Sequence, residues 1–107
     1  MRASFEDGIA AIQEVHDYAE LRARLATVIE ELRSTHDGET RPLAIRGFEA
    51  TLRGVEARND FVENDSGNIE AATRDAKRAD AALREGARLL RAAGKRLGVE
   101  VGELNGF

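Results

Sequence analysis

Small and apolar residues recur at alternating steps of three and four over four heptads, between residues 69 and 97. This spacing places them on one stripe of a single helix, which is the pattern of a helix that lies along another helix. Five of the nine positions are Ala or Gly, so the stripe favours close approach of a neighbouring backbone over a large apolar area. We call this stripe the seam, and it consists of Ile69, Ala72, Ala76, Ala79, Leu83, Gly86, Leu90, Ala93 and Leu97. We expect it to receive Leu, Ile and Phe side chains from the other helices.

A second helical pattern covers residues 4–34, with Ser4 as the expected N-cap. Its apolar positions follow steps of three between Ile9 and Leu21, whereas the rhythm of three and four is regular from Tyr18 onward. This drift turns the apolar stripe around the helix, so we expect the first half of the helix to face a different neighbour from the second half.

A third helical pattern covers residues 42–62, after a polar run in which Gly38 suits a turn. Pro42 fits the first turn of this helix, and Thr40 is its expected cap. The two glycines Gly47 and Gly54 lie beside its apolar stripe and indicate either a close helix contact or a helix that is marginal alone.

The polar residues that precede the segment 68–97 predict a second, weaker break, with Ser66 or Asn68 as the cap of the last helix. Two layouts follow from these breaks. One is an antiparallel three-helix bundle. The other is a helical hairpin in which residues 42–97 form one bent helix, leaving an apolar stripe for a partner or another copy.

The expected fold class is therefore all-α, with coiled-coil-like packing of antiparallel helices in one domain over residues 1–98. A chain of 107 residues has room for one core, and its low aromatic content without Trp is typical of long helices. The segment 99–107 is expected to be a flexible tail, unless its apolar residues find a groove in which to dock. Those residues are Val99, Val101, Leu104 and Phe107.

Charge is distributed unevenly along the chain, whose formal net charge is -4. Residues 1–37 carry eight acidic and four basic side chains, whereas residues 69–97 carry four acidic and eight basic ones. We expect these two segments to attract each other, either within one molecule or between copies.

Six cations of the last helix fall on one stripe opposite the seam, over about 30 Å of helix. We call this stripe the basic face, and it consists of Arg74, Lys77, Arg84, Arg88, Arg91 and Lys95. Such a stripe is most often a solvated helix face, and the alternative hypothesis is that it binds a polyanion such as nucleic acid. No aromatic residue interleaves with it to stack bases, and Asp75, Asp80 and Glu85 lie close by.

Residues for catalysis or metal binding are sparse. His16 and Glu20 form one i, i+4 pair, but a metal site needs three or four ligands and the other predicted helices contain no His. The Asn59–Glu70 run lacks both end ligands of a calcium-binding EF-hand loop. Since Cys is absent and no Gly-rich phosphate loop occurs, we expect no catalytic residue, cofactor, metal or small-molecule substrate.

The chain contains no apolar run of the length that spans a bilayer and no signal-peptide layout, so we expect a cytoplasmic protein, with leaderless secretion left open. Fourteen Arg against two Lys fit a GC-rich bacterial genome or its phage. With its length, its lack of Cys and a turn near Gly38, the chain resembles in layout the small leaderless substrates of type VII secretion. The Trp-x-Gly turn and the Tyr-x-x-x-Asp/Glu tail signal of those proteins are absent.

These observations predict a non-enzymatic helical interaction module that self-associates or docks a protein partner through an apolar helical stripe. Such a module would serve as a small bacterial or phage component of structural, secretion-related or regulatory kind. The alternative is a nucleic-acid-binding protein that uses the basic face.

Overall fold

The computed structural model describes residues 2–35, 38–63, 69–102 and 104, except for the side chains of residues 61–63, 69, 71 and 72. Four helices occur among the described residues, and the same residues form no strand, which confirms the all-α class. The helices are α1 (Arg2–Glu14), α2 (Tyr18–Arg33), α3 (Thr40–Glu63) and α4 (Ile69–Leu97).

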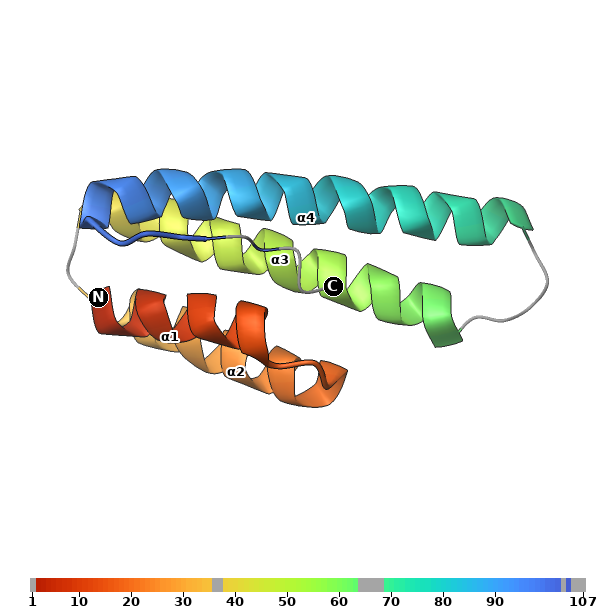
Figure 1. The fold of residues 1–107 in the computed structure, drawn as a ribbon, viewed down its shortest axis with the longest axis horizontal. Helices are drawn as coiled ribbons and strands as arrows, with labels where there is room; N and C mark the ends of the chain where they lie inside the picture. Colours follow the sequence, from red (N-terminus) through yellow and green to blue (C-terminus); the bar gives the residue numbers. More distant parts are fainter. Residues whose placement is uncertain (1, 36–37, 64–68, 103, 105–107) are drawn as a thin grey trace.

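Consecutive helices run antiparallel, and the molecule measures 47 × 22 × 22 Å (Figure 1). The two long helices α3 and α4 lie along each other, while α1 and α2 form a shorter hairpin beside one end of that pair (Figure 1). Ion pairs from Arg33 to Glu49 and from Arg22 to Glu56 place α2 along α3 to about residue 56, and the α3–α4 pair continues past the shorter hairpin (Figure 1). We call the remaining part of the α3–α4 pair, residues 57–63 and 69–79, the uncovered arm.

The structure differs from the sequence-based expectation at residues 15–17, because the predicted helix over 4–34 is two helices that fold back on each other. Asp17 has an extended backbone, and its carboxylate accepts a hydrogen bond from the backbone N–H of Glu20 at 3.0 Å. This cap satisfies a free N–H at the start of α2 and so stabilises a new helix there. Folding back also lets Ile12 of α1 and Leu25 of α2 share one core, which a single straight helix would prevent.

The start of the chain differs in a related way, since α1 already begins at Arg2 and Ser4 lies inside it. The Ser4 hydroxyl is not an N-cap, and it donates instead to the Glu31 carboxylate of α2 at 2.7 Å. That bond joins the open ends of the α1–α2 hairpin.

The helix expected over 42–62 begins at Thr40, with Pro42 in its first turn. Since α3 and α4 are antiparallel helices, residues 42–97 do not form one bent helix, and that layout is wrong. The expected caps Ser66 and Asn68 lie outside the described residues.

One hydrophobic core joins all four helices. Its centre is an edge-to-face pair of Phe5 in α1 and Phe48 in α3, with ring centroids 5.6 Å apart. Gly8 makes room for this pair, because a Cβ at Gly8 would lie 2.5 Å from the Phe48 ring. Leu90 of α4 is also fully buried in this core. The core therefore lies where α1 and α2 cover α3 and α4, at the amino end of α3.

The cap at Asp17 predicts that Asp17→Ala lowers the free energy of unfolding by about 1 kcal/mol, since the Glu20 N–H loses its acceptor. Urea denaturation followed by circular dichroism measures this. Asp7→Ala removes the same charge from an exposed position of α1 and is the matched control. Equal losses for the two variants would contradict the role of Asp17 as a cap.

Candidate interaction surfaces

Most of the seam lies against α3. Four of its residues are buried and two are half-buried; the buried ones are Ala79, Gly86, Leu90 and Ala93, and the half-buried ones are Leu83 and Leu97. Ala76 is exposed, and the side chains of Ile69 and Ala72 lie outside the described residues. The seam is thus used within the chain from residue 79 onward, and its described amino-terminal position is open.

Gly86 marks the closest approach of the two long helices. A Cβ at Gly86 would lie 2.9 Å from the backbone N of Thr51 and 3.0 Å from the backbone O of Gly47. The Thr51 hydroxyl donates to that same Gly47 oxygen at 2.9 Å, so its polar group is satisfied although it is buried. The two backbones therefore meet at a position where only glycine fits.

Large side chains of α4 fill the space above the two glycines of α3. A Cβ at Gly47 would lie 2.8 Å from Cγ of Leu90, and a Cβ at Gly54 would lie 2.6 Å from Cγ of Leu83. We expected the opposite direction, with large residues of the other helices packing into the seam. The two glycines are seven residues apart in α3, and the two leucines are seven residues apart in α4. The glycines therefore match the leucines in register. Phe48 instead turns toward α1, where Gly8 makes room for it.

All six residues of the basic face are exposed. Arg84 forms an ion pair with Asp80 at 3.0 Å, and the other five have no ion pair with any described residue. α4 forms one side of the molecule and α1–α2 the other, with α3 between them (Figure 1). The basic face is therefore a row of exposed cations on one helix, five of which pair with no described residue.

The attraction expected between residues 1–37 and 69–97 does not take the form of an ion pair between described residues of the two segments. Arg22 and Arg33 of α2 pair with α3, and Arg96 of α4 pairs with Glu39 at 3.7 Å. The charged side chains of α2 lie beside α3 instead, while α1 meets α4 through apolar contacts such as Phe5 beside Gly94. Attraction between copies stays a prediction.

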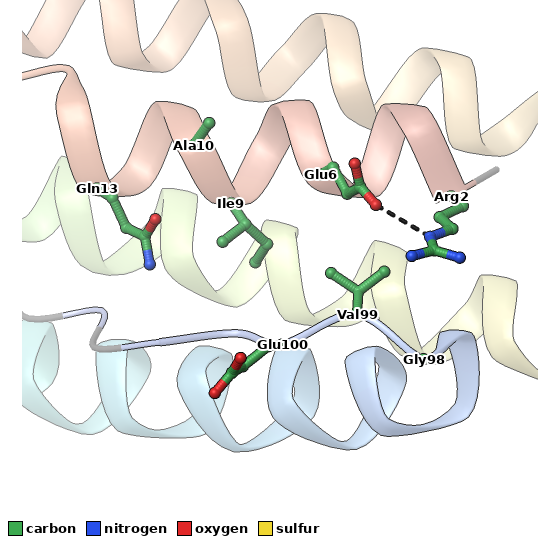
Figure 2. Close-up of a pocket in the computed structure, with 8 residues that line it drawn as sticks. All are labelled: Arg2, Glu6, Ile9, Ala10, Gln13, Gly98, Val99 and Glu100. Carbon is green, nitrogen blue, oxygen red and sulfur yellow. Dashed lines mark hydrogen bonds and ion pairs between the residues drawn. The ribbon is translucent and has the colours of Figure 1, made fainter.

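The carboxyl-terminal segment turns back at Gly98, whose φ of 71° suits glycine. The Val99 N–H donates to the Gly94 carbonyl at 2.8 Å, which closes α4 as a Schellman-type cap. The chain then runs between α1 and α4, and Val101 and Leu104 are each only 8% exposed (Figures 1 and 2). Residues 99–107 were expected to be either flexible or docked in a groove. The described residues among them are docked, and Phe107 lies outside the described residues.

A pocket of about 320 Å³ lies between α1 and the start of this segment. Figure 2 shows Val99 pointing toward α1 and Glu100 pointing away from it. The ion pair of Arg2 and Glu6, at 3.0 Å, lies on the rim of the pocket. Its lining consists of Arg2, Glu6, Ile9, Ala10, Gln13, Gly98, Val99 and Glu100. Sequence reasoning missed this pocket, although the glycine and valine after a periodic helix signal a chain that turns back and packs.

His16 lies exposed in the turn between α1 and α2. Within the described ranges, no three His, Asp or Glu residues gather as a metal site would require, and no helix has the length and hydrophobicity to cross a bilayer. Comparisons of the chain with protein-family models, curated proteins and solved structures give no match.

The tight contact at Gly86 predicts that Gly86→Leu lowers the free energy of unfolding by about 1–3 kcal/mol, because the new side chain separates α3 from α4. Thermal and urea denaturation measure this loss. Ala81→Leu adds a leucine at an exposed position of the same helix and is expected to stay within about 0.5 kcal/mol of the unmodified chain. A Gly86→Leu variant as stable as the control would show that the helices do not meet at this position.

Proposed function

We propose that this protein is a non-enzymatic helical interaction module that binds a protein partner or a second copy of itself through the apolar stripe of its uncovered arm. The observation that carries the proposal is the length mismatch between the two helical hairpins. By helix rise, α1 and α2 measure about 20 and 24 Å, whereas α4 measures about 44 Å. The shorter hairpin therefore covers only about half of the longer pair.

The covered half shows how this chain buries the apolar stripes of its long helices. There α1 and α2 add a second layer, and Phe48 and Leu90 become fully buried. In the uncovered arm Ala57 and Ala79 are buried where α3 and α4 pair, but the seam residue Ala76 is exposed. At its edge Leu52 and Leu83 are only half-buried. A partner helix along this arm would complete the layer that is missing there, with the coiled-coil-like packing that the seam predicts.

A second candidate function is binding of nucleic acid, favoured by the exposure of all six cations of the basic face. Five of them are free of ion pairs with described residues, so they are available for phosphate contacts. The net charge of -4 opposes approach to a polyanion, which is why this function ranks second.

For the first candidate, we expect Ala76→Glu to weaken association at least tenfold, because it places a charge on the exposed part of the seam. Gel filtration with light scattering over a range of concentrations measures self-association. Ala92→Glu introduces the same charge at an exposed position of α4 outside the seam and is expected to have little effect. If the unmodified chain stays a clean monomer at high concentration, self-association is excluded and only a different protein partner remains.

For the second candidate, we expect the unmodified chain to shift duplex DNA or RNA at low salt, and Arg88→Glu with Arg91→Glu to abolish that shift. The dependence of log K on log salt measures the number of phosphate contacts, at about 0.9 for each contact with duplex DNA. Arg22→Glu with Arg24→Glu makes the same change of charge on α2 and is the matched control. The absence of a shift at low salt would remove this function.

A further inference from the structure

The carboxyl-terminal segment fills a groove between α1 and the last turns of α4. We call this segment the tail, meaning the described residues 99–102 and 104. Val101 enters the space left by the missing side chain of Gly94, since a Cβ there would lie 2.5 Å from Cγ2 of Val101. On the other wall, a Cβ at Gly102 would lie 3.3 Å from Nε2 of Gln13. The groove thus accepts an extended chain closely on both sides.

Buried apolar side chains hold the described residues of the tail in this groove. The hydrogen bond from Val99 to Gly94 lies at its root, and none of the described residues from Glu100 onward forms a backbone hydrogen bond with another described residue. The apolar anchors are Val101 and Leu104, both buried, while Glu100 and Gly102 are exposed. Val99 also packs against the core, half-buried. A short segment that follows a glycine and is anchored by side chains opens at a lower free-energy cost than a helix of the core.

We propose that this groove is a binding site for an extended apolar segment, and that its occupant in trans is the tail of a second copy. The chain's own tail shows which segment the groove accepts. It is a segment with a branched side chain three residues before a leucine. A tail from a second copy makes the same contacts. Which tail occupies the groove therefore depends on the protein concentration compared with the effective concentration of the chain's own tethered tail. The pocket beside Val99 leaves α1 accessible next to the tail, which gives an incoming chain a place to enter. This groove lies at the opposite end of α4 from the uncovered arm, so it is independent of the proposed function (Figure 1).

The test uses a fluorescent peptide of residues 98–107 and a full-length receiver variant, Val101→Asp with Leu104→Asp, whose own tail no longer docks. We expect the peptide to bind the receiver at least tenfold more tightly than the unmodified chain, in which the tethered tail competes. Glu100→Ala changes an exposed residue of the tail and is expected to behave as the unmodified chain. Adding Gly94→Leu to the receiver fills the place of Val101 and is expected to abolish binding, and a peptide with the two Asp substitutions is expected not to bind.

The second-copy occupant is tested by mixing the receiver with a full-length donor, Gly94→Leu, whose groove is blocked and whose tail is free. Both variants also carry Ala76→Glu, so that association through the uncovered arm does not contribute, and light scattering is then expected to show a complex of one receiver and one donor that neither variant forms alone. A helical receiver that binds the peptide no more tightly than the unmodified chain overturns the groove. Peptide binding without a receiver–donor complex overturns the second copy as the occupant.

If the receiver does not fold, the unmodified chain decides the question. Excess unlabelled peptide is then expected to displace the tethered tail and to raise at least twofold the rate at which a Glu-specific protease cleaves after Glu100. An unchanged rate at millimolar peptide overturns the proposal.

Discussion

The structure depends on the contact between the backbones of α3 and α4 at Gly86. Because Thr51 and Gly47 lie against that position, the two helices are close enough for Leu83 and Leu90 to fill the spaces above Gly54 and Gly47. These contacts fix both the distance between the helices and their register, since each leucine has one matching glycine. A pair of helices at such short distance is long and thin, however, and buries only the sides that face each other.

The proposed binding surfaces follow from this thinness. At one end α1, α2 and the tail supply the missing cover, and the aromatic pair of Phe5 and Phe48 is fully buried there. At the other end the described chain supplies no such cover, and Ala76 of the seam is exposed. The same physical need, to remove the apolar stripes of two long helices from water, thus accounts for the internal core and for the arm that we propose binds a partner.

The sequence predicts the long helices well because their signals are local. The rhythm of three and four, followed by Gly98, gives the extent of α4, and Pro42 places the start of α3 within two residues. The break at Asp17 escaped prediction, because neither Gly nor Pro marks it and the gain from folding back comes from the distant contacts of Ile12 with the core. A periodic pattern also predicts which face of a helix packs, but it does not predict which element packs against that face. The seam was therefore identified as a packing stripe, while the direction of packing at Gly47 and Gly54 required the structure. The docking of the tail depends in the same way on Gly94, because its fit to Val101 is not visible in a helical pattern.

Small residues also limit how strongly the two proposed surfaces would bind. Burial of apolar area contributes about 25 cal/mol for each Å², so a stripe with Ala76 at its exposed position gains less from area than one built from Leu or Ile. Binding at the uncovered arm would then depend on shape, because alanines allow a second backbone to come as close as α3 does at Gly86. The tail groove follows the same rule, since the absent side chain of Gly94 makes the space that Val101 occupies. Contacts of this kind discriminate strongly among partners by fit while their affinity stays modest, which suits an association that responds to concentration.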